Sequence, residues 1–149
     1  MKRNRVVFLI SALVLLTAAV AAVHLSGRAA PVEGTLRVEK GGNAVELPIA
    51  KLELANVRGT VVNGKGESRA IDAPGLLLSA VLEAADVQAE TQVTVTADDA
   101  YSAAVSAAEL SAPDMVYLIQ QEDGGMQMVV FGDANSKRNV SDVAMVTVE

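Results

Sequence analysis

The sequence predicts an α+β domain, rich in strands and with two short helices, that follows an N-terminal transmembrane or signal helix. Three observations support this fold class. Short stretches in which polar and apolar residues alternate, as in half-buried strands, recur between turn residues along most of the chain. Only two stretches carry helix signals. A single long apolar run follows basic residues at the N-terminus.

The N-terminal segment predicts export. Lys2, Arg3 and Arg5 precede an unbroken apolar run at residues 6–23, which is just long enough to span a bilayer as an anchor. Alternatively, residues 6–18 are the apolar region of a signal peptide, with small residues beyond it as the cleavage site. Basic residues before the run and acidic ones after it favour an outside C-terminus in both cases.

This interpretation divides the chain into three segments. Residues 1–24 are the signal anchor or signal peptide, and residues 25–32 are a linker of small residues with Gly and Pro. Residues 33–149 are the exported domain. The expected location is the cell membrane, crossed once, with this domain extracytoplasmic. The alternative is secretion after cleavage.

The strands are predicted from alternation and from turn residues between them. The turn at residues 40–43 is rich in Gly, and Asn63-Gly64 is expected to supply the positive φ angles of a tight hairpin turn. Residues 49–57 fit a helical turn or an extended segment. In chain order, the expected strands lie at residues 35–39 and 44–48, on both sides of Asn63-Gly64 within 59–71, and at 91–97, 101–105, 115–121, 126–131 and 140–148.

Two short helices are predicted from their capping residues. In the first, Asp72 is the N-cap, Pro74 lies in the first turn and residues 76–85 form the body. In the second, Ser106 is the cap, and Glu109 three residues later completes a capping box.

Composition excludes several classes of function. The chain has no Cys, and its one His, His24, lies at the edge of the N-terminal apolar run, so the domain lacks the usual soft metal ligands, nucleophiles and neutral-pH bases. Without the three N-terminal basic residues, nine Lys and Arg face 18 Asp and Glu, a net charge of −9. Phosphate backbones repel such a domain, which argues against nucleic acid as a partner.

The order of these elements resembles the pterin-binding domain of the sulfite-oxidase-like molybdopterin oxidoreductases. Residues 75–87 look like the family's Gly-x-x-Leu helix, and residues 94–102 look like its strand and Asp-Gly-Tyr turn, with Ala100 in place of Gly. Residues 106–110 look like its Ser-x-x-Glu-Leu helix, and residues 116–148 look like its final hairpin and strand. The resemblance covers roughly residues 45–149 and implies a sulfite-oxidase-like pterin-domain fold.

One departure from the family concerns its catalytic ligand. Family enzymes place a Cys thiolate on molybdenum in the segment that corresponds to residues 55–62, where this chain has Asn56, Val57, Arg58 and Gly59. An amide does not replace a thiolate as a soft ligand. The resulting hypothesis is that the fold is kept while molybdenum catalysis is absent, with no cofactor and no metal.

The sequence therefore favours an exported, membrane-tethered binding or accessory module over an enzyme. The resemblance implies its setting, an extracytoplasmic redox or transport assembly with an exported or membrane protein as partner. One alternative is a divergent molybdopterin-dependent oxidoreductase that binds its cofactor without a Cys ligand. Another is an extracytoplasmic sensor of small anions.

Basic and amide side chains on two turn-rich segments are the candidate ligand-binding residues. If they converge in this acidic domain, they form an anion site; if they do not, they are solvated charges that protect strand edges. The pair Asp98-Asp99 is interpreted as a turn rather than a cation site, and Met126 and Met128 as core residues rather than copper ligands. The candidate anion-binding residues are Arg58, Lys65, Arg69, Asn135, Ser136, Lys137 and Arg138.

Overall fold

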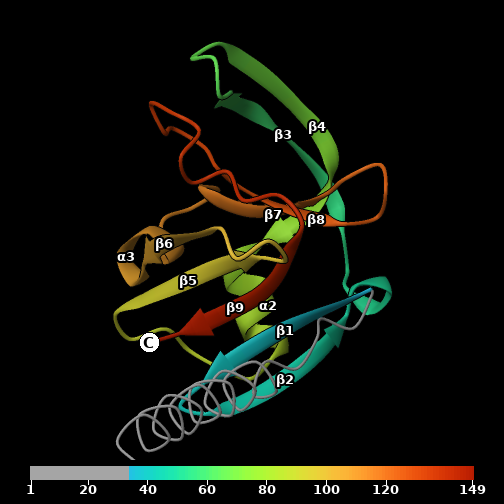
Figure 1. The fold of residues 1–149 in the computed structure, drawn as a ribbon, viewed down its shortest axis with the longest axis vertical. Helices are drawn as coiled ribbons and strands as arrows, with labels where there is room; N and C mark the ends of the chain where they lie inside the picture. Colours follow the sequence, from blue (N-terminus) through green and yellow to red (C-terminus); the bar gives the residue numbers. More distant parts are fainter. Residues whose placement is uncertain (1–33) are drawn as a thin grey trace, which may run out of the picture. The chain divides into compact units, whose positions relative to one another are not determined.

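The computed structural model describes residues 34–149, which lie within one compact unit, Pro31–Glu149. These residues form two sheets and two short α-helices (Figure 1), so the prediction of a strand-rich α+β domain is confirmed. The predicted signal segment 1–24 and linker 25–32 lie outside the described residues. Within the described part, no helix is long and apolar enough to cross a membrane.

The predicted order of strands and helices agrees with the observed one except for the start of the first helix. In chain order, the elements are β1 (Thr35–Lys40), β2 (Asn43–Pro48), the 3-10 helix η1 (Ile49–Lys51), β3 (Ala55–Val62), β4 (Ser68–Leu77), α2 (Leu78–Ala84), β5 (Gln92–Ala97), β6 (Ser102–Ser106), α3 (Ala107–Ser111), β7 (Val116–Gln120), β8 (Met126–Val130) and β9 (Val143–Val148).

The first sheet has the strand order β2-β1-β9-β5-β6. Its neighbours are antiparallel except for β1 and β9, which run parallel. The C-terminal strand therefore lies in the middle of the sheet, beside the first strand of the domain. Gly41 and Gly42 form the predicted β1–β2 turn, and both have positive φ, 57° and 82°.

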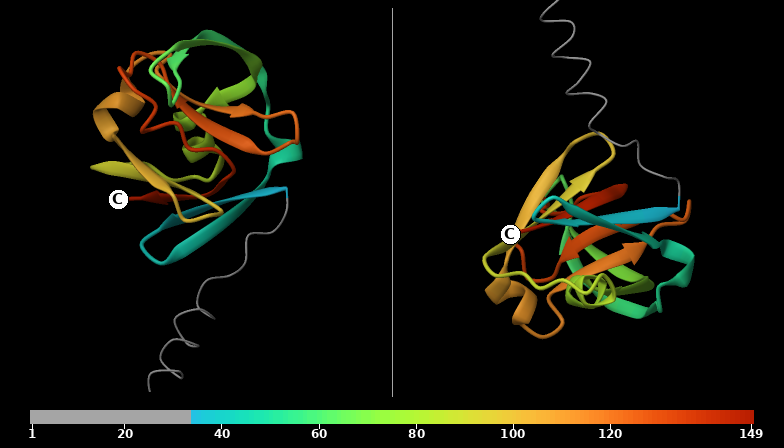
Figure 2. Two further views of the ribbon diagram at one scale, coloured as in Figure 1. Left: turned by 45° about the horizontal axis from the view of Figure 1, so that its top comes forward. Right: turned by 90° about the horizontal axis from the view of Figure 1, so that it is seen from below.

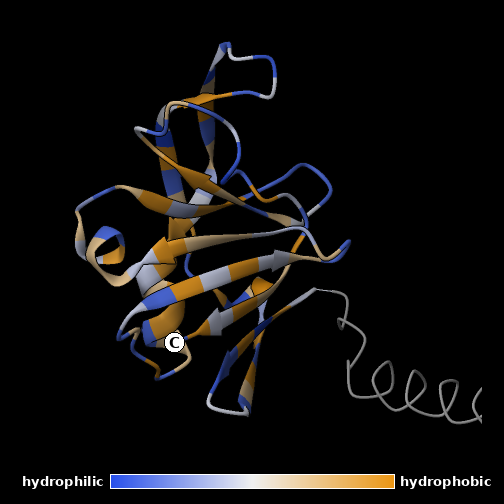
Figure 3. Cartoon of the chain, turned by 60° about the vertical axis from the view of Figure 1, so that its left-hand side comes forward, coloured by the Kyte–Doolittle hydropathy of each residue, from blue (hydrophilic) through white to orange (hydrophobic). Residues whose placement is uncertain are grey.

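The second sheet has the strand order β3-β4-β7-β8, and all its neighbours are antiparallel. Figure 2 shows it as a layer separate from the sheet that holds β1 and β9. Hydropathy alternates along the strands of both sheets (Figure 3), as expected when one face of a strand is buried.

Both faces of the second sheet bury apolar side chains. One face joins α2 and the first sheet in the main core, where Leu78, Leu118, Met126 and Met128 are fully buried. The interpretation of both methionines as core residues is thus confirmed. The other face carries a second cluster, made of Val57, Val61, Ile71, Ile119 and Val129 with Tyr117 and Phe131 packed against it.

The predicted start of the first helix is wrong. Asp72 and Pro74 belong to β4, which stays extended to Leu77, and α2 begins at Leu78 without a side-chain cap. The reason is tertiary, because residues 68–75 pair with β3 and Gly75–Leu77 pair with β7. These two ladders outweigh the local preference of Asp and Pro for a helix start.

The β3–β4 turn is longer than the tight turn predicted from Asn63-Gly64. The positive φ, 80°, falls on Gly66 instead. Asn63 stabilises the turn through its side chain, because its Oδ1 accepts hydrogen bonds from the backbone N–H groups of Lys65 and Glu67, both at 2.9 Å. This is the Asx-type contact that favours Asn in turns.

Local signals predicted the other connections well. Ser106 and Glu109 form the reciprocal hydrogen bonds of a capping box at the start of α3. Residues 49–57 contain both of the forms considered, a turn of 3-10 helix and then an extended strand from Ala55. Asp98 and Asp99 lie in the β5–β6 turn, as predicted, and the final strand begins at Val143 rather than at Val140.

Candidate functional site

The two segments that carry the candidate residues lie side by side. The Nδ2 of Asn139, at the end of the 132–139 loop, donates a hydrogen bond of 3.1 Å to the carbonyl of Val62 at the end of β3. A Cβ placed on Gly64 would lie 3.9 Å from the Oγ of Ser136. The structure thus brings the β3–β4 turn, with Lys65, to the loop that carries Ser136.

Arg58 and Arg69 do not converge. In the antiparallel β3–β4 pair, Arg58 lies opposite Asp72 and Arg69 lies opposite Val61. Cross-strand partners share a face of a sheet, and residues three apart on a strand, such as Arg58 and Val61, point to opposite faces. The two arginines therefore lie on opposite faces of the ribbon, and the seven candidate residues do not form one anion site.

Each of these arginines has a partner nearby. The Nε of Arg58 lies 3.2 Å from Asp72 Oδ2, and both side chains are well exposed, so this ion pair is weak. The Nη2 of Arg69 donates to Gln127 Oε1 at 3.2 Å, and Gln127 donates in turn to the Oγ of Ser141 at 3.2 Å. Arg69 thus connects β4 to β8 and to the segment before β9.

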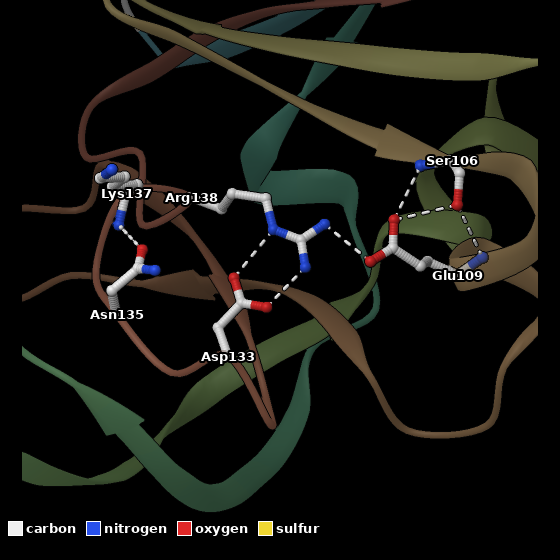
Figure 4. Close-up of polar contacts among 6 residues, drawn as sticks. All are labelled: Ser106, Glu109, Asp133, Asn135, Lys137 and Arg138. Atoms are coloured by element: carbon white, nitrogen blue, oxygen red, sulfur yellow. Dashed lines mark hydrogen bonds and ion pairs between the residues drawn. The ribbon is translucent and has the colours of Figure 1, made fainter.

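Arg138 is the centre of an ion-pair network rather than a free cation (Figure 4). Its Nε donates to Asp133 Oδ2 at 2.8 Å, its Nη2 donates to Asp133 Oδ1, and its Nη1 donates to Glu109 Oε1 at 2.7 Å. Two carboxylates therefore engage the guanidinium, which leaves little of its charge for an external anion. This argues against Arg138 as an anion-binding residue.

The same network joins α3 to the 132–139 loop. The Oε2 of Glu109 accepts hydrogen bonds from the N–H and the hydroxyl of Ser106, at 3.0 and 2.9 Å. The Ser106 N–H, more than Arg138, lowers the pKa of Glu109 below its usual value. Hydrogen bonding to Asp133, and then to Glu109, raises the pKa of Arg138 above its usual value.

The remaining candidates shape the loop. The Oδ1 of Asn135 accepts a hydrogen bond of 3.0 Å from the Lys137 N–H (Figure 4), so this amide supports the turn. The carbonyl of Lys137 accepts a hydrogen bond of 2.6 Å from the hydroxyl of Tyr101. Lys65 and Lys137 are exposed, and neither forms an ion pair with a described residue.

A pocket of about 540 Å³ opens where β3, β4 and β7 meet, and we call it the β3–β7 pocket. Arg58 is the one basic residue among its lining residues. The rings of Tyr117 and Phe131 are part of its lining, and they lie with centroids 5.5 Å apart and planes tilted by 52°. The lining residues are Glu53, Ala55, Asn56, Val57, Arg58, Gly75, Leu76, Leu77, Ala80, Asp114, Tyr117 and Phe131.

Sequence reasoning found Arg58 in this pocket but missed Tyr117, Phe131 and Asp114. The hydroxyl of Tyr117 donates a hydrogen bond of 2.8 Å to Asp114 Oδ1. Burial, and secondly this carboxylate, raises the pKa of Tyr117. A signal was present, since Tyr117 and Phe131 are two of only three aromatic residues in the described domain.

The side chains that line the pocket can bind a small ligand. They offer a guanidinium, an amide, two carboxylates and two aromatic rings, which can hold an anionic ligand with an apolar part. Among residues 34–149, no group of three or more His, Cys, Asp or Glu could hold a metal ion. No protein-family model matches the chain, and no curated protein matches it.

Proposed function

We propose that the chain is an exported, membrane-tethered binding module with a sulfite-oxidase-like pterin-domain fold, and that it binds a small anionic ligand in the β3–β7 pocket without catalysis. The observation that carries this proposal is the lining of the pocket, in which Arg58 lies together with the Tyr117–Phe131 pair. A pocket lined by both a cation and aromatic rings can recognise an anion with an apolar or planar part.

The resemblance to molybdopterin oxidoreductases supports the same position for the ligand site. The segment that corresponds to the family's ligand-bearing stretch is β3, and its first four residues, Ala55, Asn56, Val57 and Arg58, line the pocket. The molybdenum cofactor does not fit this donor set, because the pocket offers no thiolate and no imidazole for a soft metal. The proposal is therefore that this fold keeps a ligand site at the family's usual position and uses it for binding.

Arg58 is the residue that sets the charge of the ligand. Its ion pair with Asp72 is exposed on both sides, so an anion can displace that carboxylate at little cost. Glu53 and Asp114 also line the pocket, and they disfavour ligands with several negative charges. We infer a singly charged anion, or one that also carries a hydrogen-bond donor for these carboxylates.

The proposal predicts a ligand-dependent rise in melting temperature that Arg58→Ala abolishes. The probes are sulfite, sulfate, nitrate and benzoate, added separately to the full-length chain in a non-ionic detergent. At a ligand concentration about 100 times Kd, the stabilisation is about 2.7 kcal/mol, a shift of roughly 10 °C for a domain of this size.

Arg69→Ala is the matched control, because Arg69 is an exposed arginine on the opposite face of the same ribbon. It should keep the full shift. Equal loss of the shift in both variants, or no shift with any of the four anions, would count against the pocket. About one equivalent of molybdenum in the protein, purified from a host that makes the cofactor, would overturn the non-catalytic function.

The membrane tether has its own test. If residues 1–24 are an anchor, the chain stays with the membrane pellet after alkaline carbonate extraction and keeps its original N-terminus. If they are a cleaved signal peptide, the mature chain is released and begins within the small residues after the apolar run. Recovery of the intact chain in the soluble cytoplasmic fraction would contradict both forms of the export proposal.

A further inference from the structure

A second groove lies between α2 and α3, with a volume of about 560 Å³. Helix α2 separates it from the β3–β7 pocket, because Ala80 lines that pocket whereas Leu82 and Glu83 line the groove. Its apolar lining includes Leu82, Val87 and Leu110, which also belong to or pack against the main core. We call this feature the α2–α3 groove.

The charge of the groove is negative. Glu83 and Asp86 are exposed along it, and no basic residue lines it. Asp86 has a φ of 57°, and its N–H donates to the Glu83 carbonyl where α2 ends. The last turn of α2 contains no basic residue, so no cation of α2 offsets the two carboxylates or the partial negative charge of the helix end.

A cation of the chain itself already binds at the margin of the groove. The Nζ of Lys40 donates a hydrogen bond of 2.7 Å to the carbonyl of Gln88, a lining residue, and lies 3.1 Å from Glu90 Oε1. Backbone carbonyls and carboxylates at this margin thus accept an ammonium group. A lysine from another chain would find the same types of acceptor at Glu83 and Asp86.

We propose that the α2–α3 groove binds a basic, amphipathic peptide segment of a partner protein. The apolar side chains of this segment would pack on Leu82, Val87 and Leu110, and its Lys or Arg residues would face Glu83 and Asp86. A purely apolar partner would leave both carboxylates desolvated and unpaired. A second copy of this domain, in which 8 Lys and Arg face 18 Asp and Glu for a net charge of −10, would be repelled.

The test is binding of a short fluorescent peptide, made of Leu and Lys in amphipathic order, to the full-length chain in a non-ionic detergent. We expect saturable binding by fluorescence anisotropy that weakens as ionic strength rises. The double variant Glu83→Gln, Asp86→Asn should bind the peptide roughly tenfold more weakly, as expected for the loss of two local charge contacts. Asn is well tolerated at positive φ, so this variant should remain folded.

The double variant Glu122→Gln, Asp123→Asn is the matched control, because it removes the same number of charges from the turn between β7 and β8. Its affinity should stay within about twofold of the original chain. Similar weakening in both double variants would show attraction to the net charge alone and would overturn the groove. Equal binding of a peptide with Glu in place of Lys would overturn it too.

Discussion

Replacing Gly75 with alanine is expected to destabilise the domain by about 2 to 3 kcal/mol, because it overpacks a backbone contact. Gly75 is buried in β4 and pairs with Ala55 on one side and Ile119 on the other. A Cβ at this position would lie 2.6 Å from the carbonyl oxygen of Leu118 and 3.0 Å from the Cα of Ile119. Both are backbone atoms, so no rotamer change relieves the clash.

Gly64→Ala is the control for this prediction. Gly64 has ordinary φ, and the nearest atom to an added Cβ is Ser136 Oγ at 3.9 Å. Its replacement should change the free energy of unfolding by no more than about 0.5 kcal/mol. The change should be towards higher stability, because alanine lowers the conformational entropy of the unfolded chain. Denaturant unfolding of both variants measures the difference, and equal midpoints would show that β4 and β7 are not as close as described.

Replacing Arg138 with alanine is expected to cost about 2 kcal/mol at neutral pH. Breaking a fully buried ion pair costs roughly 3 to 5 kcal/mol, whereas an exposed pair contributes less than about 1 kcal/mol. The side chains of Arg138, Glu109 and Asp133 are 27%, 29% and 18% exposed, so this network lies between the two cases. Arg58→Ala, at an exposed pair, should cost less than about 0.5 kcal/mol.

The difference in the free energy of unfolding between the original chain and the Arg138→Ala variant should become smaller at acidic pH. The pKa of Glu109 is lowered in the folded state, first by the Ser106 N–H and then by Arg138. Its charged form therefore stabilises the fold above the usual Glu pKa of about 4.3, and this contribution is lost as the pH falls through the lowered value. Unfolding at several pH values measures this, and a difference that widens in acid would contradict the network.

The connections of the fold were the most predictable part of the structure. The Gly41–Gly42 turn, the capping box of Ser106 and Glu109 and the alternating strands depend on contacts within a few residues, which the sequence shows directly. The start of the first helix was wrong for the opposite reason. Asp72 and Pro74 look like a helix start locally, but pairing with β3 keeps them in β4.

The candidate site was predictable only in part. Arg58 was predicted as a candidate because it is a basic residue in an acidic domain. Its separation from Arg69 depends on the register of β3 and β4, which the positions of basic residues in the sequence do not reveal. Arg138 was predicted as an anion ligand because it lies in a turn-rich loop of an acidic domain. Its partner Glu109 lies 29 positions away in the sequence, and only the fold brings the two together. The rings of Tyr117 and Phe131 likewise come together only because β7 pairs with β8.

The sequence by itself determined the class of the domain, its cysteine-free chemistry, its negative charge and the core role of Met126 and Met128, because these properties follow from composition and local pattern. The tertiary structure alone decided which charges meet. It engages Arg138 with two carboxylates, places Arg58 in the lining of a pocket that also contains two aromatic rings, and exposes Glu83 and Asp86 along a groove. Side-chain neighbours of this kind depend on long-range pairing and register, which local patterns do not specify.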